Sequence, residues 1–306
     1  MKPLFRPYLA LLVVCIVWGT TYVGLSIALQ TIPPLWLAGL RLTIPGILMS
    51  GWSLATGKPL PDWKTLKQVF IEALLIQFSA NVLITWSLQF VSSGLVALLC
   101  TLIPFFVVLL QLVVFRSESF SRRIILGILI SFLGMIVLYA DNSLNIQTPN
   151  YLLGIGLVMF SNLTWAWGSI LSSRETNSLD IFFSAGLQLL LAGILIILLA
   201  TQLETIDWKA TAPIAWWATA YLIVFDSILA FSCYLYALKT LPTTLVAIFA
   251  YVNPVIAIAL GWLVLKEPFT AKTGLACFII LFGVYLINAG YGERKSSPSS
   301  NELSKS

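Results

Sequence analysis

Long apolar runs alternate with short polar linkers along the whole chain. About ten runs have the roughly 20 residues that cross a hydrocarbon core about 30 Å thick. They cover residues 8–29, 35–55, 69–89, 93–115, 123–140, 151–172, 181–200, 213–238, 243–265 and 272–288. Lipid offers the backbone no hydrogen-bond partners, so each run must be helical, and a barrel would instead need alternating polarity. The pattern predicts an all-α polytopic membrane protein with about ten transmembrane helices.

Composition supports a membrane protein and narrows its chemistry. Hydrophobic residues make up 59% of the chain and charged residues 9%, whereas soluble domains carry roughly 25% charged residues. There is no histidine, the commonest metal ligand and a frequent catalytic base. No G-x-x-x-x-G-K-[ST] motif is present, so ATP-driven pumping is not expected. We expect no enzyme activity, no cofactor, no metal and no nucleic-acid partner.

Loop charges predict the orientation in the membrane. In the first half, Lys and Arg fall in loops on one side only, which should be cytoplasmic. They are Lys2, Arg6, Lys58, Lys64, Lys67, Arg116, Arg122 and Arg123. The second half is mixed, because Lys209, Lys266 and Lys272 fall on the opposite side. An even number of helices places both termini in the cytoplasm. We expect the protein to lie in the plasma (inner) membrane as a multi-pass protein.

The sequence repeats itself. Residues 95–104 (LVALLCTLIP) align with residues 245–254 (LVAIFAYVNP), so Pro104 and Pro254 are 150 positions apart. The frame A-G-L-x-L-x-x-x-G-I-L also occurs twice, at 38–48 with Arg41 and at 185–195 with Gln188 in its place. The shared frame predicts packing common to both halves. We therefore expect a five-helix repeat at 1–140, a second at 151–289, and a disordered cytoplasmic tail at 290–306.

An odd number of helices per repeat has a topological consequence. Two tandem five-helix units must lie in the membrane with opposite orientations, and such inverted repeats are typical of secondary transporters. The prediction is therefore two inverted five-helix repeats.

Several of these features together resemble a known family. They are Trp18-Gly19 in the first helix, Leu40-Arg41-Leu42 in the second, the prolines of the fourth and ninth, and acids before the fifth and tenth (Glu118, Glu267). The chain resembles the EamA-type branch of the drug/metabolite transporter superfamily over nearly its whole length. The resemblance implies a ten-helix inverted-repeat fold and export of small metabolites, often amino acids. One departure is Ser117 before Glu118, where the family more often has Gly.

Two charged residues inside apolar runs are the sharpest candidates for coupling or gating. Asp226 lies near the centre of the eighth helix, where a charge costs about 2.5–3.5 kcal/mol. It is either a protonation or cation site, or a neutral carboxyl that joins helices. Arg41 lies roughly 9 Å below the outer end of the second helix. It either snorkels, acts as a gate or substrate anchor, or pairs with Asp226 or helix-end carbonyls.

Other residues predict a cavity and two bends. Pro104 and Pro254 remove helix hydrogen bonds to the carbonyls of residues 100 and 250, which predicts hinges beside a wet cavity. Polar and aromatic residues at mid-depth are expected to line that cavity. They are Trp18, Tyr22, Gln77, Asn81, Trp86, Asn162, Trp165, Tyr234, Tyr251 and Asn253.

Two smaller expectations concern packing and solvent. Small residues in the fifth helix (Gly127, Ser131, Gly134) and the tenth (Gly274, Ala276, Gly283) favour close helix approach, within a monomer or between protomers. Glu72, near the cytoplasmic start of the third helix, is expected to be hydrated.

The function favoured by these features is secondary transport by alternating access, with export of amino acids or related small metabolites. Proton coupling and simple facilitated diffusion both remain open. One alternative is a flippase for an amphiphilic or lipid-linked substrate; a membrane enzyme is disfavoured because the acids are scattered. The expected partners are the bilayer, a small-molecule substrate and, with coupling, protons, for a monomer or weak homodimer.

Overall fold

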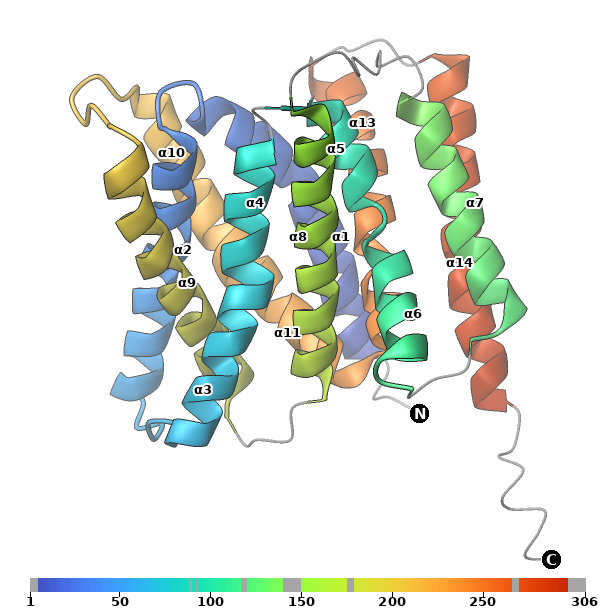
Figure 1. Ribbon diagram of the computed structural model, residues 1–306, viewed down its shortest axis with the longest axis horizontal. Helices are drawn as coiled ribbons and strands as arrows, with labels where there is room; N and C mark the ends of the chain where they lie inside the picture. The colour runs from blue at the N-terminus through green and yellow to red at the C-terminus, as the bar shows by residue number, and fades with distance from the viewer. Residues whose placement is uncertain are drawn as a thin grey trace, which may run out of the picture.

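The computed structural model is a bundle of membrane-length helices (Figure 1). It describes residues 5–87, 90–91, 93–116, 120–139, 150–174, 179–265 and 270–296. Within these residues, the following segments are long and apolar enough to cross a membrane: Trp63–Ser87, Tyr151–Ser173, Ile181–Leu203, Pro213–Thr240 and Ala271–Gly290. Shorter apolar helices occur at Phe5–Thr21, Leu98–Val113 and Thr243–Ile256. The fold is an all-α polytopic membrane protein with about ten membrane crossings.

The first half contains α1 to α7. Its helices are α1 (Phe5–Ala28), α2 (Pro34–Ala55), α3 (Trp63–Glu72), η1 (Ala73–Phe78), α4 (Ser79–Ser87), α5 (Ser93–Cys100), α6 (Ile103–Val113) and α7 (Arg122–Tyr139). The segment α3–η1–α4 is one continuous crossing, whereas α5 and α6 are separated by a turn at Thr101 and Leu102.

The second half contains α8 to α14 and follows the same plan. Its helices are α8 (Tyr151–Ser173), α9 (Ile181–Leu203), α10 (Pro213–Tyr221), η2 (Leu222–Ala230), α11 (Phe231–Thr240), α12 (Thr243–Val246), α13 (Phe249–Leu265) and α14 (Ala271–Ser296). The first helix of this half runs opposite to α1, so the two halves are inverted (Figure 1). We call the lower face of Figure 1, where α1 begins and α14 ends, the terminal face, and the opposite one the distal face.

The repeated A-G-L frame packs the halves together. Along the crossing of α2 and α9, the glycines of each frame admit the backbone of the other helix. A Cβ on Gly46 would lie 2.4 Å from the backbone nitrogen of Leu190, and one on Gly193 would lie 2.6 Å from that of Thr43. The frame is thus a packing surface used by both repeats.

The fifth crossings, α7 and α14, form a second close pair at the other end of the bundle (Figure 1). A Cβ on Gly127 would lie 2.6 Å from the carbonyl of Gly283, and Ser131 donates to the carbonyl of Ile280 at 3.2 Å. The small residues therefore serve helix packing within the monomer. Helix α14 continues to Ser296, so helix replaces the first residues of the expected tail.

Both third crossings contain a π-helical segment at matching places. The segments η1 and η2 begin at residues 73 and 222, which are 149 positions apart. A π-helix widens the backbone spiral and is frequent at functional sites. These segments carry Gln77 in the first half and Asp226 with Ser227 in the second.

Candidate functional site: a cavity at the repeat interface

A cavity of about 560 Å³ lies inside the bundle between the two halves. Its mouth is formed by residues at helix ends on the distal face, including Leu29, Pro34 and Glu204, and its deep end reaches Trp18 and Asn253. Helices of both repeats line it: α1, α2, η1, α4, α5, α6, α8, α9, η2, α11 and α13. Its size is within the range of about 300–1,000 Å³ that is usual for small-molecule sites.

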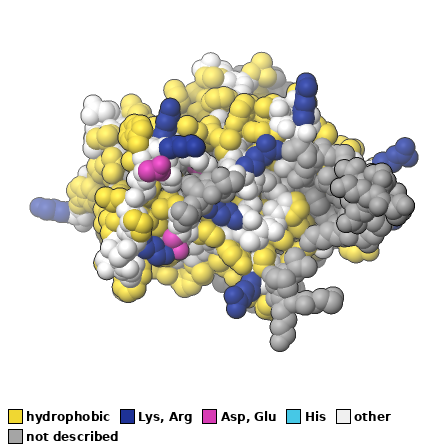
Figure 2. Space-filling view, turned by 90° about the horizontal axis from the view of Figure 1, so that it is seen from below, with side chains coloured by type: hydrophobic (Ala, Val, Ile, Leu, Met, Phe, Trp, Pro, Cys, Tyr) yellow, Lys and Arg dark blue, Asp and Glu magenta, His cyan; other side chains and the backbone are white. Residues whose placement is uncertain are grey.

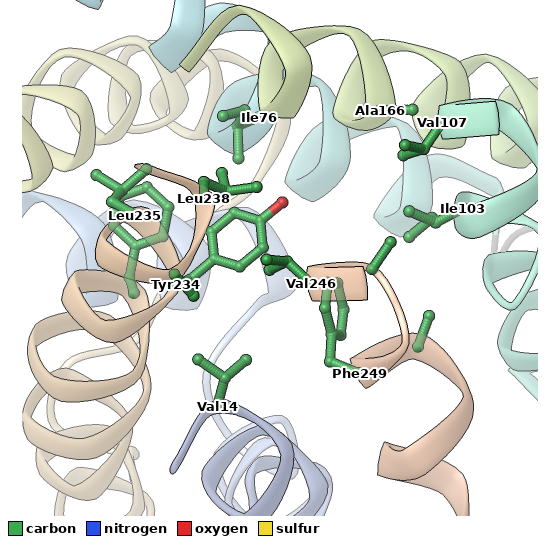
Figure 3. Packing of buried hydrophobic residues seen from close by; sticks show 14 of the residues in the cluster. Val14, Ile76, Ile103, Val107, Ala166, Tyr234, Leu235, Leu238, Val246 and Phe249 are labelled. Carbon is green, nitrogen blue, oxygen red and sulfur yellow. The ribbon is translucent and has the colours of Figure 1, made fainter. Parts of the chain in front are cut away.

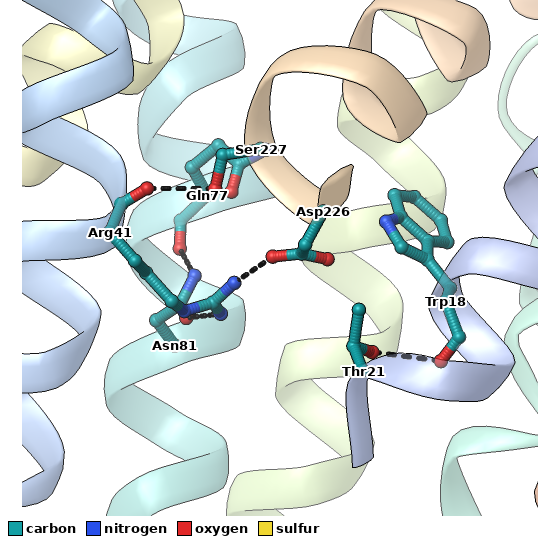
Figure 4. A network of polar contacts seen from close by, with 7 residues as sticks. All are labelled: Trp18, Thr21, Arg41, Gln77, Asn81, Asp226 and Ser227. Atoms are coloured by element: carbon teal, nitrogen blue, oxygen red, sulfur yellow. Dashed lines mark hydrogen bonds and ion pairs between the residues drawn. The ribbon is translucent and has the colours of Figure 1, made fainter. Parts of the chain in front are cut away.

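Arg41 and Asp226 form an ion pair across the cavity wall (Figure 4). A guanidinium nitrogen of Arg41 on α2 binds Oδ2 of Asp226 on η2, and another donates to Oδ1 of Asn81 at 2.6 Å. Asn81 in turn donates to the carbonyl of Gln77 at 2.6 Å. The hydroxyl of Ser227 donates to the carbonyl of Arg41 at 2.7 Å. The two candidates named from the sequence therefore meet, and Arg41 points into the bundle instead of snorkelling to its end.

The Arg41–Asp226 pair remains partly accessible from the cavity. The side chains of Arg41 and Asp226 are 16% and 12% exposed, and both line the cavity. Figure 4 shows the Asp226 carboxyl between the Arg41 guanidinium and the α1 residues Trp18 and Thr21. A solute in the cavity can therefore reach both charges.

Aromatic rings close the deep end of the cavity. Trp18 contacts Phe249 and Trp165 with ring centroids 4.7 Å and 5.9 Å apart. Tyr234 lies behind these rings, 5.2 Å from Trp18, and its hydroxyl accepts from the Trp165 indole at 2.9 Å. This arrangement offers apolar and π surface next to one positive and one negative group.

Below the rings, a buried layer separates the cavity from the terminal face. Val14, Tyr234, Leu235, Leu238 and Val246 pack there with little or no exposure (Figure 3). A second cavity of about 520 Å³ lies at the terminal end of the bundle, lined by Gln111, Ser173, Arg174, Leu238, Lys239, Thr240, Leu241, Pro242 and Thr243. Among the described residues, one cavity therefore lies toward each face and the buried layer lies between them.

Most of the predicted lining residues line the cavity, and three of them do not. Trp18, Gln77, Asn81, Asn162, Trp165 and Asn253 line it. Trp86 does not, because it is 51% exposed on the outside of the bundle. Tyr234 and Tyr251 are buried behind the wall instead of lining it. The Tyr22 side chain, Glu118 and Glu267 lie outside the described residues.

The two predicted hinge prolines have different settings. Pro104 lies in the first turn of α6, directly after the break from α5. Asn162 donates to the carbonyl of Leu99, in the last turn of α5 before that break, at 2.7 Å. Pro254 lies inside α13, several residues after the break that separates it from α12. The Asn253 amide, oriented with its nitrogen toward the two carbonyls, donates to Phe249 at 3.0 Å and Cys15 at 3.1 Å. A break therefore precedes each proline, but at unmatched positions.

Sequence reasoning missed Glu204 and misjudged Glu72. The Glu204 carboxylate accepts from the backbone N–H groups of Leu35 and Trp36 at 2.9 Å and 3.2 Å, which caps α2 at the cavity mouth. The signal was α2 itself, whose preceding Pro33 offers no capping side chain. Glu72 is fully buried and accepts from Gln188 at 2.8 Å, so the expectation that it is hydrated was wrong.

The terminal face carries many of the cations. Figure 2 shows this face from below, with Lys and Arg side chains around it. The loop residue Lys58 there pairs with Asp180 at 2.5 Å. Partial burial raises the pKa of Asp180. The hydrogen bonds from Lys58, Phe183 and Phe182, together with the Lys58 charge, lower the pKa by a larger amount, so it lies below its usual value.

An inverted bundle of about ten crossings, with a cavity at the repeat interface that holds an ion pair, is typical of a multi-pass membrane transporter. The chain belongs to the EamA-like transporter family, which it matches over residues 5–140 and 152–289.

Relatives and a solved structure agree with this assignment. The chain is 30% identical to the uncharacterized inner membrane transporter YedA of Escherichia coli (strain K12), covering 95% of this chain and 92% of that protein. It is 23% identical to the uncharacterized transporter YoaV of Bacillus subtilis (strain 168), covering 94% and 98%. A solved crystal structure with 20% identity superposes with a TM-score of 0.81 over 95% of this chain and 99% of that one, which supports the fold. These similarities point to a transporter rather than an enzyme.

Proposed function

We propose that this protein is a secondary transporter that exports amino acids or related small zwitterionic metabolites by alternating access. The observation that carries the proposal is the Arg41–Asp226 pair inside a cavity that reaches the distal face and is closed toward the terminal face. The terminal face is assigned to the cytoplasm, because it carries the loop cations of the first half.

The pair supplies complementary anchors for a zwitterion. A substrate carboxylate competes with Asp226 for the Arg41 guanidinium, which suits bidentate binding. The substrate ammonium takes the Asp226 carboxylate, and the side chain packs on Trp18, Trp165 and Phe249. Asn81 keeps Arg41 in place while its ion pair opens.

The two cavities support alternating access. The distal cavity is the release side in this conformation, and the layer around Tyr234 and Val246 is the barrier that must part in the other. The inverted repeats provide the second conformation, because each half can adopt the shape of its counterpart.

A flippase is less well supported. A lipid-linked substrate needs a groove open to the bilayer, whereas this cavity is lined from helices all around the bundle interior. The transported class is therefore a small solute.

Metabolite profiling tests the substrate class. Culture medium from cells that overexpress the chain should accumulate one or more amino acids, compared with cells that express the Arg41→Gln variant. Accumulation of only uncharged or lipid-linked compounds would overturn the proposed class.

Coupling is tested separately in proteoliposomes with the solute so identified. If protons are coupled through Asp226, the flux follows an imposed pH gradient and Asp226→Asn abolishes that dependence. Flux that ignores the gradient in the unmodified protein indicates facilitated diffusion.

A further inference from the structure

The inverted repeats contain a second polar pair, which mirrors the first. Arg41 of the first half binds Asp226 on the third crossing of the second half. Gln188 stands at the corresponding position of the second A-G-L frame, and it binds Glu72 on the third crossing of the first half, with Nε2 to Oε2 at 2.8 Å. Each second crossing therefore contacts an acid on the third crossing of the other repeat.

The two pairs occupy inverted positions in the bundle. Arg41 lies seven residues after the start of α2 at the distal face, and Gln188 lies seven residues after the start of α9 at the terminal face. Both depths are about 10 Å at the rise of an α-helix. Glu72 directly precedes η1, and Asp226 lies one helical turn inside η2.

The second pair is closed in this conformation and rich in acceptors. Glu72 and Gln188 have no exposed surface, and Ser184 is 2% exposed. Gln188 Oε1 is buried and accepts no hydrogen bond from the part of the chain that the structure describes, while Nε2 also reaches the Ser184 hydroxyl at 3.4 Å. A buried acceptor without a donor is costly, and an ammonium group supplies three donors with a positive charge.

We propose that Glu72 and Gln188 form a second, cation-selecting site that binds the ammonium group of the transported solute when the terminal side opens. The inference rests on the proposed function, since it requires the opposite conformation. Exchange of conformations between the halves would make Glu72 line a terminal cavity, as Asp226 lines the distal one now. Gln188 replaces a guanidinium with an amide, so this site favours the ammonium end of the solute over its carboxylate.

Charge-selective labelling of a cysteine beside Glu72 tests the proposal. Ser184→Cys is introduced into a chain whose four cysteines are replaced by Ala: Cys15, Cys100, Cys233 and Cys277. Membrane vesicles that expose the terminal face are treated with impermeant cationic or anionic methanethiosulfonates. The cationic-to-anionic rate ratio at the introduced thiol should exceed that of free 2-mercaptoethanol about tenfold, because the Glu72 carboxylate attracts the cation. Glu72→Gln, which keeps the shape of the side chain, should return the ratio to the free-thiol value, and Glu72→Asp should restore it.

Two results overturn the proposal. One is the absence of reaction at the introduced thiol while an exposed control, Thr56→Cys, reacts from the same face. The other is a ratio equal to that of the free thiol in the protein with intact Glu72, which requires no Glu72 variant to fold. The readout needs no identified solute, so a cation preference at the Ser184→Cys thiol in a protein that exports no amino acid would support this site and contradict only the proposed substrate.

Discussion

Arg41 shows at the residue scale how this chain tolerates a charge in an apolar helix. An unpaired arginine at this depth is costly, but Asp226 and Asn81 accept from its guanidinium. Each partner comes from a different helix, so the charge also joins α2 to both third crossings. The sequence placed Arg41 and Asp226 among alternatives, and only the fold brings them into contact.

Removing one member of this pair should cost more than removing both charges. Arg41→Gln leaves the Asp226 carboxylate in the cavity wall without its cation, and we expect a loss of about 3 kcal/mol. The double variant Arg41→Gln with Asp226→Asn should regain at least half of that loss. Thermal unfolding in detergent, followed by tryptophan fluorescence, measures the stability of the double variant and of the two single variants, Arg41→Gln and Asp226→Asn. A double variant as unstable as the sum of the single variants would show that the two side chains do not interact.

Asp180 combines two roles that substitutions can separate. Its Oδ1 accepts from the N–H groups of Phe182 and Phe183 at 3.1 Å, which caps α9, while Oδ2 pairs with Lys58. Its pKa is lower in the folded state, so its contribution is present above the unfolded value of about 3.9 and is lost as the pH falls through the folded value. Asp180→Asn keeps the cap and loses the charge.

We therefore expect Asp180→Asn to lower the unfolding free energy at pH 7 by less than about 1 kcal/mol, because both partners of the pair are 38% exposed. The difference from the unmodified protein should shrink as the pH falls below about 4. Asp180→Ala, which also removes the cap, should cost about 1 kcal/mol more. Equal losses for Asn and Ala at pH 7 would contradict a separate capping role.

At the element scale, glycine placement on α2 and α9 offers a matched comparison. A Cβ on Gly193 would lie 2.4 Å from Thr43 Oγ1 and 2.6 Å from its backbone nitrogen, whereas one on Gly51 would meet nothing within 4 Å. Gly193→Ala should destabilise the protein by about 1–3 kcal/mol through overpacking. Gly51→Ala should be neutral or raise stability by up to about 1 kcal/mol. Similar unfolding midpoints for the two variants would refute the close packing of α2 on α9.

The sequence predicted the crossings better than the irregularities inside them. Run length and apolarity are properties of single segments, so they located the crossings, although α3 begins at Trp63, earlier than expected. The π-helical segments and the break before α13 are local departures from regular α-helix, which hydropathy does not encode. Trp86 and Tyr251 do not line the cavity, because polarity at mid-depth does not tell which side of a helix faces the cavity.

At the scale of the whole molecule, the internal repeat gave the most information. It predicted inverted halves, and therefore a site at their interface. It could not predict that Gln188 reaches Glu72, because the acids of the third crossings are one turn out of register and do not align. The two halves thus share a packing frame but differ in charge at the corresponding positions Arg41 and Gln188.

The proposed orientation makes the two cavities distinguishable in intact cells. Leu29 lies at the mouth of the distal cavity and is 42% exposed, whereas Thr240 is exposed in the cavity at the terminal face. In a cysteine-free chain, an impermeant maleimide should label Leu29→Cys in intact cells at least tenfold faster than Thr240→Cys, and permeabilisation should remove the difference. Equal labelling rates of the two cysteines in permeabilised cells show that the thiols do not differ in intrinsic reactivity. The opposite preference in intact cells would place the terminal face outside, and the distal cavity would then face the cytoplasm, as the loading side of an exporter in place of its release side.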